Sequence, residues 1–199
     1  MKAIIAVAVL ALLGASSAGA VEIKDKWGIG AGVFGRGGEI SLIRGRSERS
    51  AWLFDVAVSL RDDPVRIEYV PPQPFTATTT NSNSVSILAG PGFRRFTRAG
   101  DDFSPYWDIH MRGRFDRQHR GGASSNTRTV AGAEGEFAFG LEYFTRWHFS
   151  VAAHSSLLTL SWAHLNDRQF APGFEYHSAG HSTGVSIGLS PVIYLRGYF

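Results

Sequence analysis

The sequence predicts an all-β fold, an eight-stranded antiparallel up-and-down transmembrane β-barrel that follows a cleaved signal peptide. Three observations predict it: a long alternating strand at the C-terminus, a secretory leader at the N-terminus, and further alternating segments between them. From Val185 to Phe199, apolar residues dominate one parity and small, polar or basic residues the other. A period of two indicates a β-strand with one face in an apolar medium, and this strand exceeds the roughly 9–11 residues that cross a bilayer.

The N-terminus has the three regions of a secretory signal peptide. A basic start precedes an apolar run over 3–13, and the small residues that follow end in Ala18-Gly19-Ala20. The apolar run is shorter than the roughly 20 residues that a membrane-spanning helix needs. We therefore interpret residues 1–20 as a signal peptide that is removed on export, and residues 21–199 as one barrel domain.

The composition excludes several classes of protein. The formal net charge is only +3 at pH 7, so the charge balance predicts no nucleic-acid partner. The chain has no cysteine, which excludes both disulfides and a lipid-anchored lipoprotein. After the leader, no apolar run is long enough for a membrane helix, as expected of a barrel in which only alternate residues meet lipid.

The first four strands follow from their alternating faces. Strand 27–33 alternates glycines with apolar residues, so its inner face is glycine. Strand 39–46 has no clear facing, because its aliphatic residues share a parity with two arginines. Strand 52–61 is regular, with aromatic and aliphatic residues on one face and Asp55 on the other. Strand 85–94 places valine, isoleucine and phenylalanine outside and small or basic residues inside.

The last four strands are predicted in the same way. Strand 105–116 has apolar residues outside and charged residues inside, and strand 133–143 pairs an apolar face with one that carries three glutamates. In strand 148–162 the parity slips near Ser156-Leu157-Leu158, which predicts a β-bulge. Strand 185–199 completes the eight.

The connections predict which way the barrel is oriented. The turns near Ser47, Ala99 and Arg146 are short, and short turns are typical of the periplasmic end. Three long polar stretches at the other end are predicted to be outer loops, over 62–83, 117–128 and 163–180. Aromatic residues gather at the short-turn end, as an interfacial girdle would: Trp27, Trp52, Phe96, Phe103, Tyr143, Trp147, Phe149 and Phe199.

Over essentially all of residues 21–199, the chain resembles the small eight-stranded bacterial outer-membrane barrels, the OmpA-, OmpX- and OmpW-like group. The signal peptide, the strand count and the ending Leu195-Arg196-Gly197-Tyr198-Phe199 carry this resemblance. It implies export through the periplasm to the outer membrane and contact with outer-membrane lipid and lipopolysaccharide. It also implies a monomer that the barrel-assembly machinery inserts, with Tyr198 and Phe199 as the assembly signal.

A soluble lipocalin-like barrel or β-sandwich is the alternative fold. Such proteins turn apolar residues inward and charges outward, and parity alone does not separate the two faces. Two features favour the membrane barrel. The polar face carries many glycines, as a narrow lumen requires, and its charges have both signs, while lysine is absent after Lys26.

The inner faces predict a network of charges in the lumen. Antiparallel pairing of the fifth and sixth strands would place Arg112 beside Glu134 and His110 beside Glu136. An eight-stranded interior is just wide enough for side chains to fill, so we expect a salt-bridged plug, with a gated pore as the alternative. The predicted network is Asp55, Arg94, Asp108, His110, Arg112, Arg114, Glu134, Glu136, Glu142 and Arg196.

No motif in the chain specifies catalysis, a cofactor or a metal. His177-Ser178 and His181-Ser182 lie near Asp167 and Glu175, but the His-x-Ser-Asn signature of lipid A deacylases is missing. We therefore expect no catalytic, cofactor-binding or metal-binding residues. The predicted function is a non-enzymatic outer-membrane barrel with a structural or surface-interaction role through its long outer loops. The alternatives are a small pore and a lipid-A-modifying acyl-transfer or deacylase enzyme.

Overall fold

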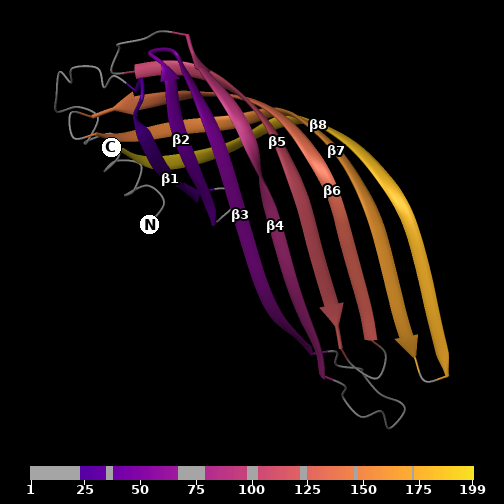
Figure 1. Ribbon diagram of the computed structural model, residues 1–199. Helices are drawn as coiled ribbons and strands as arrows, with labels where there is room; N and C mark the ends of the chain where they lie inside the picture. The colour runs from indigo at the N-terminus through magenta and orange to yellow at the C-terminus, as the bar shows by residue number, and fades with distance from the viewer. Residues whose placement is uncertain are drawn as a thin grey trace.

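The computed structural model describes residues 23–34, 38–66, 79–97, 103–121, 125–145, 148–171 and 173–199. Eight antiparallel strands pair in chain order, and β8 returns to pair with β1, so the sheet closes into a barrel (Figure 1). The strands are β1 (Trp27–Phe34), β2 (Glu39–Ser47), β3 (Ser50–Arg66), β4 (Thr79–Phe96), β5 (Phe103–Arg120), β6 (Ser125–Phe144), β7 (Phe149–Ala171) and β8 (Phe174–Tyr198). The predicted all-β fold of eight antiparallel strands in up-and-down order is confirmed, whereas the predicted signal peptide lies outside the described residues.

Among the described strands, the ring of eight is complete only over part of the barrel's length, because β1 and β2 are short. They have 8 and 9 residues, against 23 and 25 in β7 and β8. The β1–β8 pairing ends at Phe34↔Ile193, and the β2–β3 pairing ends at Glu39↔Ala57. We call the part in which β1 and β2 complete the ring the closed half.

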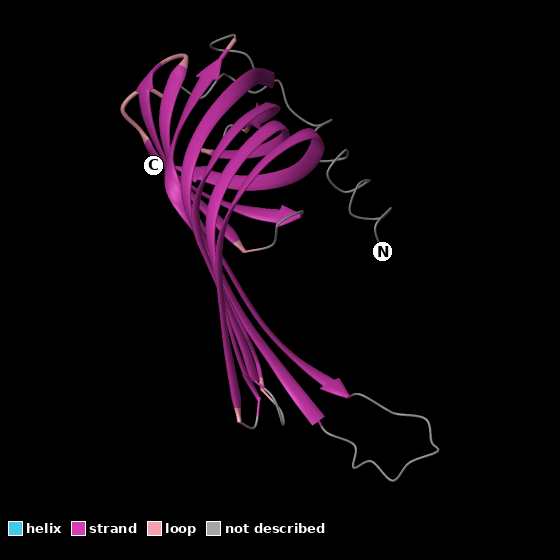
Figure 2. Cartoon of the chain, turned by 90° about the vertical axis from the view of Figure 1, so that its right-hand side faces the viewer, coloured by secondary structure: helices cyan, strands magenta, loops and turns pink. Residues whose placement is uncertain are grey.

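Beyond the closed half, β3 to β8 continue as a sheet that we call the open sheet. Its two edges are residues 58–66 of β3 and 174–192 of β8, which have no second neighbouring strand among the described residues. Figure 2 shows the ring at one end and the long twisted sheet extending away from it. No helix among the described residues is long and apolar enough to cross a membrane.

The three predicted outer loops are wrong in their described residues. β5 continues to Arg120 and β6 begins at Ser125, and β7 continues to Ala171 before β8 begins at Phe174. The first stretch is also partly strand, although its residues 67–78 lie outside the described ones. The error has a physical cause. Alternation marks a strand only where one face is apolar, and these parts of the open sheet carry polar side chains on both faces.

The predicted facing of the strands is otherwise correct except at Phe96 and Tyr143, which were expected in the outer aromatic girdle and are buried. The ambiguous second strand turns Glu39 and Ser41 inward and leaves Ile40 and Leu42 exposed. The predicted bulge is present at Leu157, because Phe137 pairs with Leu158 while the next residue pairs with Ser156. The bulge restores the parity of β7, so both of its halves keep their apolar residues outside.

Glycines on the inner face make room for large side chains. A Cβ atom at Gly92 would lie 2.5 Å from Nδ1 of His110, and one at Gly30 would lie 2.6 Å from Cγ of Arg196. Real Cβ atoms do not approach other atoms so closely. The lumen of the closed half is therefore filled by charged side chains that pack against bare backbone.

Candidate functional site

The closed half has charged residues inside and apolar residues outside. Arg94 is 1% exposed and Asp108 is 0% exposed, whereas Trp52 on the outer face is 50% exposed and Ile109 is 48% exposed. We call the exposed outward apolar residues of the closed half and of the adjoining part of the open sheet the apolar belt. It includes Trp27, Ile29, Ile40, Leu42, Trp52, Phe54, Val58, Leu60, Val85, Ile87, Ile109, Met111, Phe115, Phe137, Phe139, Leu141, Leu160, Trp162, Val185, Ile187, Leu189 and Leu195.

Glu142 is the centre of the deepest charge cluster. Its Oε2 accepts from Nη1 of Arg94 at 2.7 Å and from Nη1 of Arg196 at 3.0 Å. Its Oε1 accepts from the hydroxyl groups of Tyr198, at 2.7 Å, and Ser150. One buried carboxylate thus binds two guanidinium groups and two hydroxyl groups, which is the pairing that a buried charge requires.

Arg94 joins this cluster to the middle of the lumen. Its Nε and Nη2 donate to the two carboxylate oxygens of Asp108 at 2.8 and 2.7 Å, a bidentate pair. The guanidinium group also lies 3.7 Å from the centre of the Tyr106 ring, close enough for a cation–π contact. Arg94 is therefore held by two acids and an aromatic face.

Two histidines connect Asp108 to neighbouring acids. His110 lies between Asp55, with its Nδ1 2.6 Å from the carboxylate, and Asp108, at 3.6 Å from Nε2. His154 lies between Asp108, at 3.4 Å from Nδ1, and Glu136, at 3.5 Å from Nε2. The chain of charges thereby extends across the lumen from β3 to β7.

Arg112 is the buried arginine nearest to the open sheet. Its guanidinium group lies 3.2 Å from Glu134, in contact with Glu136, and 3.8 Å from Glu39. Tyr194 donates its hydroxyl to Glu39 at 2.7 Å. The strand register is the one expected from the sequence, with Arg112 opposite Glu134 and His110 opposite Glu136.

An aromatic and aliphatic layer closes the lumen at the end away from the open sheet. The Phe96 ring lies 5.8 Å from the Tyr106 ring and 6.0 Å from the Phe144 ring, and Phe144 lies 5.7 Å from Tyr198. Further buried members of this layer are Ile23, Ile43, Ala51 and Leu53. The interior of the closed half is thus occupied by side chains at this level.

Arg114 is a correction to the predicted network. Its side chain is 47% exposed and pairs with Asp116 at 2.5 Å in the open sheet. The other nine predicted lumen residues are buried and lie within the closed half: Asp55, Arg94, Asp108, His110, Arg112, Glu134, Glu136, Glu142 and Arg196.

Sequence reasoning missed several members of the network, and three of them were missed for a definable reason. Glu39 was missed because the second strand had no clear facing. His154 was missed because the parity of its strand breaks at the bulge three residues later. Tyr194 was missed because a tyrosine on an inner face signals packing rather than a bond to an acid. Alternation read separately on each side of the bulge would have found His154.

The buried network contains more acids than arginines. Its carboxylates are those of Glu39, Asp55, Asp108, Glu134, Glu136 and Glu142, while its guanidinium groups are those of Arg94, Arg112 and Arg196. Two histidines, His110 and His154, are the remaining groups that can carry positive charge. Because its carboxylates outnumber its guanidinium groups, the described lumen favours protonated histidines or a bound cation.

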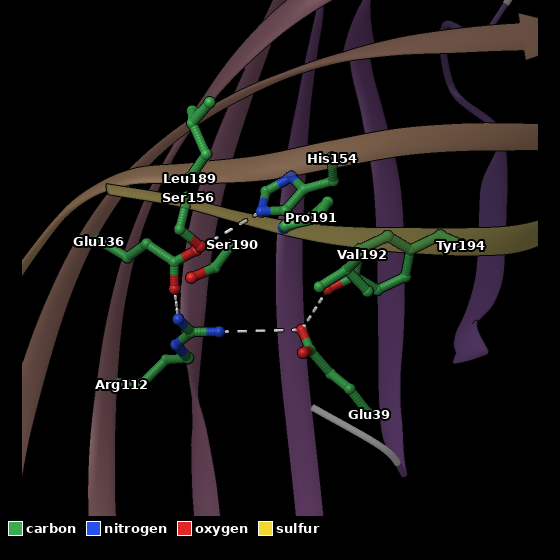
Figure 3. Close-up of a pocket in the computed structure, with 10 residues that line it drawn as sticks. All are labelled: Glu39, Arg112, Glu136, His154, Ser156, Leu189, Ser190, Pro191, Val192 and Tyr194. Atoms are coloured by element: carbon green, nitrogen blue, oxygen red, sulfur yellow. Dashed lines mark hydrogen bonds and ion pairs between the residues drawn. The ribbon is translucent and has the colours of Figure 1, made fainter. Parts of the chain in front are cut away.

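A cavity of about 350 Å³ lies at the end of the closed half that adjoins the open sheet. Arg112, Glu136 and Glu39 lie along one side of it, and residues of β8 lie opposite (Figure 3). The ten residues that line it are Glu39, Arg112, Glu136, His154, Ser156, Leu189, Ser190, Pro191, Val192 and Tyr194.

His177 and His181 do not pair with the serines that follow them in the sequence. They lie on β8, where adjacent residues point to opposite faces of the sheet. His177 faces away from Ser178 and pairs with Glu175 at 3.5 Å on the exposed surface. In the described parts of the chain, no group of three or more histidines, cysteines or acids is arranged to hold a metal ion.

No protein-family model matches the chain, and no curated protein or solved structure is significantly similar to it.

Proposed function

We propose that this protein is a non-enzymatic integral β-barrel protein of the bacterial outer membrane. In this proposal the closed half and the adjoining apolar part of the open sheet are the membrane anchor, and the polar remainder of the open sheet extends outward as a surface for interaction. The observation that carries the proposal is the distribution of residues in the closed half, with buried charges inside and an exposed apolar belt outside. A soluble barrel has the reverse distribution, and a membrane barrel has this one.

The extent of the belt supports a membrane-spanning role. On β3 it continues to Leu60, and on β8 it continues from Leu195 up to Val185. Beyond it, the outward residues become polar, as at Asp62 and His181. A belt that changes to polar residues along each strand matches the limited thickness of a hydrocarbon layer.

The terminus supports assembly as an outer-membrane barrel. The backbone N–H of Phe199 donates to the carbonyl of Trp27 at 2.8 Å, and the N–H of Trp27 donates to Phe199 at 3.0 Å. The last residue thus helps to close the ring, while its side chain is largely exposed. We propose that Tyr198 and Phe199 are read by the barrel-assembly machinery, and that the assembled monomer contacts lipid and lipopolysaccharide.

A structural or adhesive role is favoured over conduction. Salt bridges among Arg94, Asp108 and Glu142 fill the lumen, and an aromatic layer closes it below. The surface available for interaction is the open sheet, which replaces the predicted long loops in this role. Its edges on β3 and β8 carry backbone groups without a neighbouring strand in the described structure, and such edges pair readily with other chains.

Acyl-ester hydrolysis is a second candidate, because the cavity contains a serine and a histidine. Ser156 and His154 are two residues apart on β7, so they share the inner face, and His154 lies near the carboxylates of Asp108 and Glu136. Serine, histidine and acid are the groups of acyl-transfer catalysis. A mass spectrum of lipid A from cells with and without the protein separates the candidates, since only an enzyme would change it.

Membrane anchoring is tested by extraction and flotation. Bacterial membranes that contain the protein should float with it in a density gradient and retain it through urea and carbonate washes. The folded protein in detergent should migrate differently on a gel before and after boiling. A protein that stays soluble without detergent after these steps would overturn the proposal.

A further inference from the structure

The cavity between the closed half and the open sheet lies beside the free edge of β8. Successive residues of a strand point to opposite faces, so a cavity enclosed by the barrel is lined by one parity of β8. Here both parities line it. Ser190 and Val192 contribute from the inner face, and Leu189 and Pro191 contribute from the outer face. At this level β8 has no neighbouring strand on its other side among the described residues, so the cavity adjoins the free edge of β8.

At this point of the apolar belt, β8 has no second neighbouring strand in the described parts of the chain. The β1–β8 pairing ends at Ile193, and most of the cavity residues of β8, Leu189 to Val192, come just before it in the strand. In the part of β8 that precedes Ile193, Leu189 is 69% exposed, and Ile187 and Val185 are more than two-thirds exposed. In a membrane this stretch of edge would face lipid, where backbone groups without partners are unfavourable. A molecule from the lipid layer could reach the cavity without crossing a strand.

The polar groups of the cavity select the kind of molecule. The carboxylates of Glu39 and Glu136 outnumber the one guanidinium group, that of Arg112, so the cavity favours a cation. Arg112 is 5% exposed, and its Nε has no hydrogen-bond acceptor among the described residues. The site thus offers two acids to an ammonium group and one buried donor to an acceptor oxygen.

We propose that this cavity binds the polar head of a membrane amphiphile that enters sideways between β3 and β8, and that this head carries an ammonium group together with acceptor oxygens, as an ethanolamine phosphate does. The acyl chains would lie along Leu189 and Ile187 on the outer face of β8, in continuity with the apolar belt. The inference rests on the proposed membrane location.

Retention of lipids by the purified protein in detergent tests the inference. Three phospholipids with the same acyl chains are added separately, with ethanolamine, choline or glycerol as the head alcohol, and one-to-one complexes are measured by native mass spectrometry. We expect the ethanolamine lipid to be retained most, because its ammonium donates hydrogen bonds that choline lacks. We expect the anionic glycerol lipid to be retained least. Equal retention of the three lipids, or preference for the anionic one, would overturn the proposal.

Two variants locate the binding to this cavity. Glu39→Gln removes one carboxylate and should weaken retention of the ethanolamine lipid about tenfold, the effect of losing one charge-assisted hydrogen bond. Ser190→Phe should fill the cavity and abolish retention. Its matched control is Ser186→Phe, which makes the same change on the same face of β8 outside the cavity lining.

Folding of each variant is verified by the change in gel mobility on boiling, and Ser190→Phe tests the site even if Glu39→Gln does not fold. Retention that is unchanged in folded Ser190→Phe would overturn the inference. Because retention is measured in detergent, it is independent of the flotation experiment. A protein that floats with membranes but retains no lipid would contradict only the cavity, whereas one that does not float would contradict the proposed function.

Discussion

The closed half and the open sheet are built from the same strands, yet their side chains meet different surroundings. In residues 192–198 of β8 exposure alternates, whereas residues 174–191 are exposed on both faces. The difference is the β1–β2 hairpin, whose pairing ends at Phe34↔Ile193 and Glu39↔Ala57. With the hairpin, eight strands enclose the inner face, and without it the inner face stays open. A charged side chain on the inner face is therefore buried only where the ring of eight strands is complete, whichever strand carries it.

The largest expected difference between the two regions comes from removing an arginine in each. Arg94→Ala leaves the buried carboxylates of Asp108 and Glu142 with fewer partners, and should lower the free energy of unfolding by about 3–5 kcal/mol. Arg114→Ala removes an exposed partner of Asp116 and should cost less than about 1 kcal/mol. Urea unfolding in detergent measures both, and similar losses would show that ring closure does not isolate the lumen charges from solvent.

Sequence reasoning succeeded in the closed half because one face of each strand is apolar there. The alternation of β5 and β6 placed opposite charges on their inner faces, and the expected pairing of Arg112 with Glu134 is present. The broken parity of β7 was sufficient to place the bulge at Leu157. These features follow from local patterns, since each strand has to keep its apolar residues on one side.

The open sheet could not be predicted in the same way. Segments such as 163–180 have polar residues on both faces, and polarity without alternation is also the pattern of a loop. What makes them strands is pairing between neighbours, as in Arg168↔His177. The cavity was missed for a related reason: it depends on where β1 ends relative to β8, which is a property of the assembled sheet.

Glycines give a second comparison between the regions, with a smaller expected effect. Gly92→Ala in the closed half would place a Cβ atom 2.5 Å from His110 Nδ1, and should destabilise the fold by about 1–3 kcal/mol through overpacking. Gly188→Ala in the open sheet meets no heavy atom within 4 Å and should change stability by less than about 0.5 kcal/mol. Thermal or urea unfolding distinguishes them, and a tolerated Gly92→Ala would mean that the lumen is loosely packed.

The smallest expected effect on the folded barrel comes from the last residue. Phe199 is 76% exposed, so Phe199→Asp should scarcely change unfolding in detergent. In cells the same variant should lower the amount of protein in the outer membrane, if the terminal aromatic is read during assembly. Quantitative blots of fractionated cells measure this amount, with Phe174→Asp, a similarly exposed residue at the far end of β8, as the control. Equal assembly of the Phe199 variant and the wild type would contradict the proposed assembly signal.

Spin labels attached at single cysteines test the central claim most directly. The natural chain has no cysteine, so each introduced residue gives one label. Ile109→Cys lies in the apolar belt of β5 and His177→Cys lies on the outer face of the open sheet. In lipid vesicles, the account predicts that the label at 109 is relaxed mainly by oxygen, which concentrates in lipid. It predicts that the label at 177 is relaxed mainly by a water-soluble nickel complex. Relaxation by nickel that is equally strong at both positions would contradict the membrane barrel.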